Sequence, residues 1–176
     1  MSASSTISTT NDRSAHRAPA FGIAATLLPV RLVFQWGEAV AGVLHLRDTP
    51  GPSGEREGLG ARLNEPGAPF LPFSPAGAGR RLQLVHRNAV AYVEHPGDLP
   101  EIARLRALGA VAHPVEVDLT TGELLQGELL AIAPPDRRRL SDLLNQGETF
   151  LSLVDAGRTL YLHRDAVARV RSRDDA

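Results

Sequence analysis

Short runs of alternating apolar and polar residues dominate the second half of the chain. Val115, Val117 and Leu119 alternate with polar residues, a pattern typical of a β-strand with one buried face. Thr121-Gly122 and residues 155–157 have the composition of hairpin turns. Further strands are predicted at residues 124–132, 150–154, 159–163 and 166–171. This half is therefore predicted to be a unit of five short strands.

Two segments have helical spacing instead. Within residues 137–145 three leucines stand at i, i+3 and i+4, which predicts one or two turns of helix. The second segment follows Asp98, which we expect to be its cap. Pro100 suits the first turn and Gly109 the end of this helix. The second helix carries a narrow apolar face, Ile102, Leu105 and Leu108.

The chain contains an internal repeat. Residues 30–44 align without gaps to residues 115–129, and LGARLN (59–64), PFLPF (69–73) and HRNAVAYV (86–93) meet LSDLLN (140–145), TFLSL (149–153) and HRDAVARV (163–170) in the same order. The last pair is identical at six of eight positions. Four matches in the same order indicate a tandem duplication. Valines three apart in the last strand of each copy predict a bend or bulge there.

The repeat divides the chain into five segments. We expect a disordered leader at residues 1–20, a first small barrel at 21–93, a linker with a short helix at 94–114, a second small barrel at 115–171, and a tail at 172–176. The leader is rich in Ser and Thr and holds few large apolar side chains, so burial cannot offset the entropy of ordering it.

The unit resembles the small, strongly bent barrels of the SH3-like and Sm-like type. Leu119, Gly122, Gly127 and Leu129 have the spacing of the first Sm-like motif, and LHRDAVARV (162–170) is similar to the second. The phrases LSDLLN, FLSL and HRDAV also resemble uncharacterised bacterial small-barrel domains with no established activity. These resemblances imply a mainly all-β chain of two tandem five-stranded barrels, each with a short helix, joined by a helical linker.

Composition narrows the range of functions. The 176 residues contain no cysteine, which excludes disulfides and thiolate chemistry and makes a cytoplasmic location the default expectation. All 19 basic residues are arginine, and the net charge is −1. Counted by unit, residues 30–93 carry 7 Arg and 5 acids (+2), and residues 115–176 carry 8 Arg and 11 acids (−3). No apolar stretch is long enough to span a membrane.

The best candidates for a ligand site are the two His-Arg turns, which recur between the fourth and fifth strands. They comprise His86, Arg87 and Asn88 in the first copy and His163, Arg164 and Asp165 in the second. Arg offers a planar fork for phosphate or carboxylate, and His a switchable donor. In the alternative interpretation, Asn88 or Asp165 closes the turn through its side chain and the arginine pairs with a carboxylate.

The spacing before each turn determines whether the two histidines face the same way. Relative to the leucine pairs 82/84 and 160/162, the first copy has one extra residue, Val85. The two histidines then face alike only if a bulge absorbs that residue.

Asn64 and Asn145 form a second recurring pair, at the end of each leucine-rich turn. Asn commonly ends a helix in the left-handed conformation, so a C-cap is favoured over a ligand contact. The histidines lack the paired spacing of a metal site, and no catalytic motif is present. We therefore expect neither metal nor cofactor nor enzymatic activity.

Two functions remain. We expect a non-catalytic binding or assembly module that contacts another protein through strand edges. The alternative is a single-stranded RNA-binding protein of Sm-like type that uses the His-Arg turns.

Overall fold

Alternating strands and glycine turns build a mainly β structure, as predicted. The computed structural model describes residues 25–48, 57–77, 81–132, 134, 139–145 and 147–173. The first half contains β1 (Ala25–Phe34), β2 (Ala39–Arg47), α1 (Leu59–Asn64), β3 (Phe70–Pro75), β4 (Gln83–His86), the 3-10 turn η1 (Arg87–Ala89) and β5 (Val90–Pro96). The second contains α2 (Pro100–Ala107), β6 (Val111–Leu119), β7 (Leu124–Ala131), α3 (Leu140–Leu144), β8 (Phe150–Asp155), β9 (Arg158–His163), η2 (Arg164–Ala166) and β10 (Val167–Ser172).

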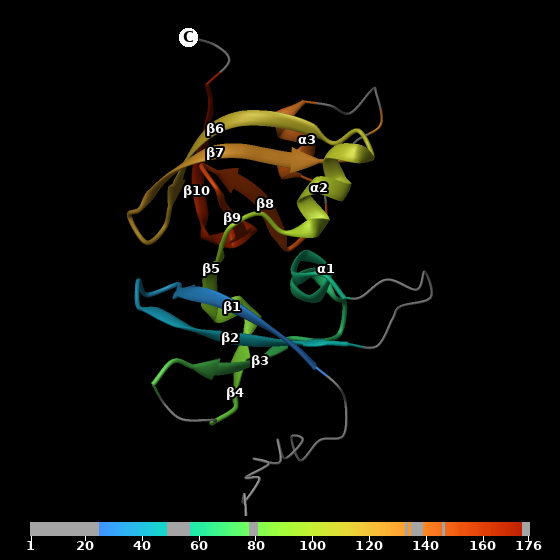
Figure 1. Cartoon of the computed structure of the whole chain (residues 1–176). Helices are drawn as coiled ribbons and strands as arrows, with labels where there is room; N and C mark the ends of the chain where they lie inside the picture. Colours follow the sequence, from blue (N-terminus) through green and yellow to red (C-terminus); the bar gives the residue numbers. More distant parts are fainter. Residues whose placement is uncertain are drawn as a thin grey trace, which may run out of the picture.

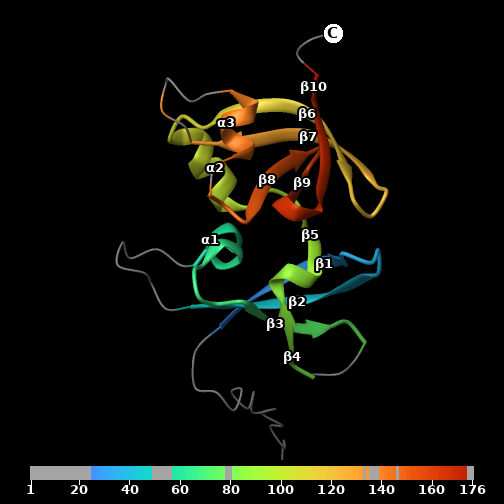
Figure 2. The ribbon, with the colours of Figure 1, turned by 180° about the vertical axis from the view of Figure 1, so that it is seen from behind.

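The strands form one open antiparallel sheet in the order β10-β6-β7-β8-β9-β5-β1-β2-β3-β4. The order β5-β1-β2-β3-β4 of the first half recurs in the second as β10-β6-β7-β8-β9, which matches the predicted duplication. The two halves lie one above the other, joined where β5 runs beside β9 (Figures 1 and 2). One edge of β5 pairs with β1. Its other edge pairs with β9 of the second half rather than with β4 of its own half, so the sheet remains open.

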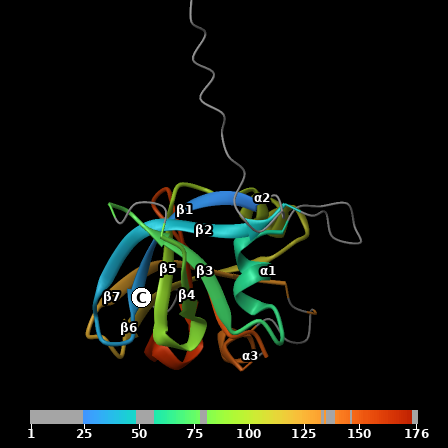
Figure 3. The same cartoon turned by 90° about the horizontal axis from the view of Figure 1, so that it is seen from below.

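Glycines allow the tight bends that the repeat requires. Gly37 and Gly122 have φ of 86° and 88° in the equivalent first hairpins, a conformation that side chains disfavour. Gly42 in β2 and Gly127 in β7 pass so close to the next strand that an added Cβ would lie 2.3 Å from the Ser74 carbonyl oxygen and 2.5 Å from that of Val154. Seen from below, β1 and β2 arch across β3 and β5, with α1 beside them (Figure 3).

The predicted irregularity of the last strand is present in both halves. The pairing of β1 with β5 skips Ala91, and the pairing of β6 with β10 skips Ala168. These equivalent alanines are bulge residues, which explains the valine spacing.

One apolar cluster fills each half, and each cluster also includes residues from the opposite half. The first cluster includes Leu130, Phe150 and Tyr161 from the second half. The second includes Val33 and Tyr92 from the first. The halves therefore share their cores.

The linker is shorter than predicted, because β5 extends to Pro96 and β6 begins at Val111. Helix α2 has Pro100 at its first turn as expected, but the predicted cap is wrong: the N-cap is Leu99, which offers no side-chain hydrogen bond. Ile102 is buried in the first cluster, whereas Leu108 is exposed.

The predicted leader, residues 1–20, lies outside the described residues, as do residues 174–176 of the tail. Among the helices that are described, none has the length and apolar character that a membrane span requires.

Candidate functional site

The two His-Arg turns have the same local geometry. Nδ1 of His86 accepts a hydrogen bond from the backbone N–H of Asn88 at 3.3 Å, and Nδ1 of His163 accepts one from that of Asp165 at 3.2 Å. Each imidazole packs edge-on against a phenylalanine, Phe70 or Phe150. The histidine side chain thus closes each turn, a role that the sequence interpretation gave to Asn88 or Asp165.

The histidines are in equivalent registers without a bulge. His86 pairs with Phe70, and His163 pairs with Phe150. The first copy has no extra residue before its histidine, so this prediction is wrong. The leucine pairs 82/84 and 160/162 on which it rested do not occupy equivalent positions. Val85, opposite Leu71, matches Leu162, opposite Leu151.

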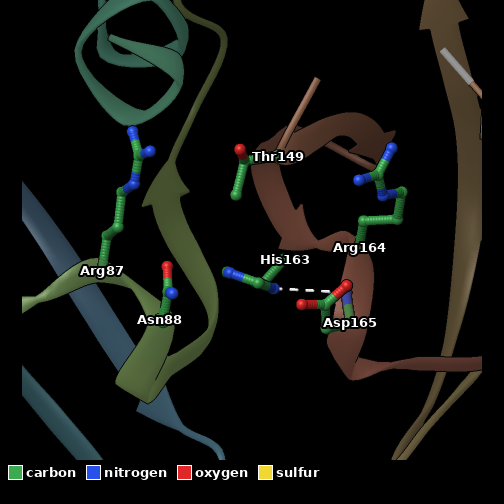
Figure 4. A pocket seen from close by; sticks show the side chains of 6 residues that line it. All are labelled: Arg87, Asn88, Thr149, His163, Arg164 and Asp165. Atoms are coloured by element: carbon green, nitrogen blue, oxygen red, sulfur yellow. Dashed lines mark hydrogen bonds between the residues drawn. The ribbon is translucent and has the colours of Figure 1, made fainter. Parts of the chain in front are cut away.

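Both turns line one pocket at the junction of the halves. It has a volume of about 200 Å³ and is lined by Arg87, Asn88, Thr149, His163, Arg164 and Asp165. Figure 4 shows Arg87 and Asn88 on one side and the other four residues opposite. This volume is below the roughly 300–1,000 Å³ of common small-molecule sites, so the pocket suits one small polar group.

His163 presents a hydrogen-bond donor to this pocket. Burial lowers the pKa of His163 below its usual value and outweighs the opposing effect of the Asp165 charge, while the nearby Arg87 and Arg164 charges act in the same direction as burial. The side chain is therefore neutral at pH 7. Since Nδ1 accepts a hydrogen bond, the proton belongs on Nε2. This Nε2 is buried without a hydrogen-bond partner and points toward the side of Arg87 and Asn88 (Figure 4).

The two arginines of the pocket differ in orientation. Arg87 extends to the end of α1, where one terminal nitrogen donates to the carbonyl oxygens of Leu63 and Glu65 at 3.2 and 2.8 Å. Its Nε is buried and has no partner. The guanidinium of Arg164 points away from His163 (Figure 4). The arrangement offers a small hydrogen-bond acceptor two unsatisfied N–H donors, those of Arg87 and His163.

Comparison of the chain with protein-family models, with curated proteins and with solved structures finds no match. The assignment of function therefore rests on the site itself. Within the described residues, no cluster of three or more His, Cys, Asp or Glu side chains is suited to a metal ion.

Asn64 connects the two halves and lies outside the pocket. Its side-chain amide accepts from the Phe150 N–H at 2.8 Å and donates to the Phe150 carbonyl at 3.1 Å, which satisfies the start of β8 as a strand neighbour would. Asn64 is the last residue of α1, and the C-cap is Glu65. The predicted cap is therefore wrong for this residue.

Asn145, its counterpart, is the C-cap of α3, as predicted. Its φ of −94° is not left-handed. The side chain donates to the Ser141 carbonyl within its own helix at 2.8 Å.

Sequence reasoning missed the polar contacts that seal the junction. Glu101 of α2 accepts from the Gly60 N–H at 2.9 Å and from the Tyr161 hydroxyl. Tyr92 donates to Glu123 at 3.0 Å, and burial together with this contact raises the Tyr92 pKa to about 12. No local pattern marks these residues, since each partner lies far away in the sequence.

An apolar surface beside β4 was also missed. Phe70, Leu82 and Leu84 are about half exposed or more, and β4 is the end strand of the described sheet. Contiguous exposed apolar groups beside a strand edge are typical of a binding surface. The leucine alternation of residues 82 and 84 was a signal that could have identified it.

Proposed function

We propose that this protein is a non-catalytic assembly module, built from two small bent barrels of the SH3-like or Sm-like type, that binds another protein chain through its strand edges. The repeated five-strand order and the paired glycines at the bends support two related units of this type. The observation that carries the function is the β4 edge with Phe70, Leu82 and Leu84. An edge strand with exposed apolar neighbours offers backbone hydrogen bonds for affinity and side-chain contacts for specificity.

The β4 edge is tested by capture with the tagged full chain in a lysate of its own source. We expect the wild-type chain to retain specific partners that Leu84→Asp loses. Leu108→Asp is the matched control, because Leu108 is as exposed as Leu84 (64% and 65%) and lies after α2, outside the strands of the sheet. A wild-type chain that retains nothing, or an L84D chain that retains the same set, contradicts the proposal.

A second candidate is single-stranded RNA binding, which the convergence of the His-Arg turns favours. The pocket gathers residues of both turns and two unsatisfied donors, on Arg87 and His163. Phosphate and base oxygens are acceptors for such groups.

RNA binding is tested by fluorescence anisotropy with a labelled single-stranded oligonucleotide of mixed sequence. Binding through the pocket predicts an affinity that falls steeply between about 50 and about 200 mM salt and is lost in Arg87→Ala/Arg164→Ala. Arg106→Ala is the control, since Arg106 pairs with Glu128 on the surface. Absence of binding at low salt excludes this candidate.

A further inference from the structure

The junction between the halves is a contact between two copies of one unit. Strand β5 pairs with β9, with Val93 opposite Tyr161 and Glu94 opposite Leu160. Beside this ladder Tyr161 packs near α1, where a Cβ on Gly60 would lie 2.9 Å from the tyrosine ring. Asn64 of α1 holds the backbone of Phe150. The junction therefore combines a strand ladder, an apolar contact and an asparagine bridge.

The repeat places counterparts of both sides of this junction at the two ends of the sheet. In the common register, β4 is the counterpart of β9 and β10 is the counterpart of β5. These are the two end strands. The β4 end of the sheet therefore corresponds to the β9 side of the internal junction, and the β10 end corresponds to its β5 side.

On the β4 side, residues that match buried positions of the junction are exposed. Phe150, Tyr161 and Thr159 are at most 3% exposed, whereas their counterparts Phe70, Leu84 and Leu82 are 49%, 65% and 46% exposed. Two of the three counterparts keep an apolar character, and Leu82 is more apolar than the threonine it matches. The β4 surface is therefore apolar at the positions whose counterparts are buried in the internal junction.

On the other side, α3 matches α1. Leu59 and Leu63 of α1 are fully buried, while their counterparts Leu140 and Leu144 are only partly buried. Asn145 stands where Asn64 makes its bridge.

The size of the side chains at this contact is also matched. Gly60, which faces the large Tyr161, corresponds to Ser141, and Tyr161 corresponds to the smaller Leu84. A larger helix residue therefore stands opposite a smaller strand residue.

We propose that copies of this chain associate head to tail, with β10 of one copy pairing with β4 of the next in the register of the internal junction. Val170 then lies opposite Leu84, and Arg171 opposite Gln83. Asn145 reaches the backbone of Phe70 in the next copy. This inference rests on the proposed assembly function and names its partner as a second copy of the chain.

The opposite net charges of the units, +2 and −3, favour contact between a first unit and a second unit over contact between like units. A contact between unlike surfaces leaves a free surface at each end, so chains add to form a closed ring or an open filament.

The new contact is more polar than the internal junction. Where Val33 and Tyr92 enter the second cluster, their counterparts are the ion pair Asp118–Arg169. Association between copies is therefore weaker than the internal junction and depends on concentration.

Each contact between copies also completes a second pocket. The internal pocket takes Arg87 and Asn88 from one unit and His163 from the other. At the new contact, Arg164 and Asp165 of one copy meet His86 of the next.

Sedimentation velocity of the full chain over a range of concentrations tests the proposal with three variants. Leu84→Asp blocks the β4 side, and Ser141→Arg blocks the α3 side. Both positions are exposed, so neither change disturbs the fold of one copy, which circular dichroism verifies. Leu108→Asp is the control, with an exposed leucine outside the strands of the sheet.

We expect the wild type and L108D to form species of several chains, and L84D and S141R each to remain monomeric. An equal mixture of L84D and S141R restores one intact contact and gives a dimer. A wild type that is monomeric at all concentrations overturns self-association. If such a monomer still captures another protein that L84D loses, the assembly function stands. A mixture that stays monomeric, or an S141R chain that still associates, overturns the head-to-tail geometry.

Discussion

At the scale of single residues, equivalent positions of the two copies have acquired different roles. Asn64 bridges to the buried backbone of Phe150, whereas Asn145 bonds only within its own helix. The same residue type thus serves the junction in one copy and a helix end in the other. The difference depends on what lies beside each helix.

Replacing Asn64 by Ala is expected to lower the free energy of unfolding by about 1–3 kcal/mol, because it leaves the buried Phe150 N–H without a partner. Asn145→Ala is the matched control and is expected to cost clearly less, since that side chain is exposed. Urea denaturation monitored by circular dichroism measures both. Equal losses in the two variants would contradict the bridging role of Asn64.

His163 is expected to make stability depend on pH. Its pKa in the folded state is lowered by burial, so the unfolded chain takes up a proton first as the pH falls below about 6.5. The folded state therefore loses stability toward acid.

The contribution of His163 is obtained by comparing wild type with His163→Asn at about pH 7.5 and about pH 5 in thermal denaturation. We expect the melting temperature of the variant to fall less between the two pH values than that of the wild type. Asn64→Ala, which changes no titrating group, should follow the wild type. An H163N chain with the pH dependence of the wild type would refute the assignment.

At the scale of elements, the close approach of neighbouring strands explains why both copies carry glycine in their second strand. Gly127 of β7 has the Val154 carbonyl where a Cβ would stand. Backbone cannot yield as the end of a flexible side chain can. The bend between these strands therefore requires glycine.

Gly127→Ala is expected to destabilise the protein by about 1–3 kcal/mol through overpacking. Gly147→Ala, where an added Cβ meets nothing within 4 Å, is the control and is expected to be neutral or slightly stabilising. Chemical denaturation of the two variants decides between these outcomes. A G127A chain as stable as G147A would show that the strands can separate without cost.

At the scale of the whole molecule, the shared clusters couple the two halves. Phe150 and Tyr161 complete the first cluster, and Val33 and Tyr92 complete the second. Neither half can unfold without exposing apolar surface of the other.

We therefore expect a single cooperative unfolding transition. Trp36, the only tryptophan, reports on the first half through its fluorescence, and far-ultraviolet circular dichroism reports on the strands of both halves. The two urea curves should coincide. A second transition seen only by circular dichroism would show that the second half unfolds by itself.

The sequence by itself determined the local structure and the duplication. Strand alternation, the hairpin glycines and the Leu140-Leu143-Leu144 helix depend on neighbours a few residues away, so they can be identified along the chain. Comparison of the two copies also located the His-Arg turns as equivalent sites. The sequence pattern failed to locate the cap of α2, because the N-cap is Leu99, one residue after the predicted Asp98.

Only the tertiary structure decided how the two copies meet. It joined β5 to β9 in one open sheet, brought Arg87 and His163 to one pocket, and set Asn64 against Phe150, 86 positions away. Such contacts depend on side chains packing between distant segments, and local patterns carry no record of the partner. For the same reason, the exposure of Phe70 and Leu84 indicated a contact surface only when it was compared with the burial of their counterparts, Phe150 and Tyr161.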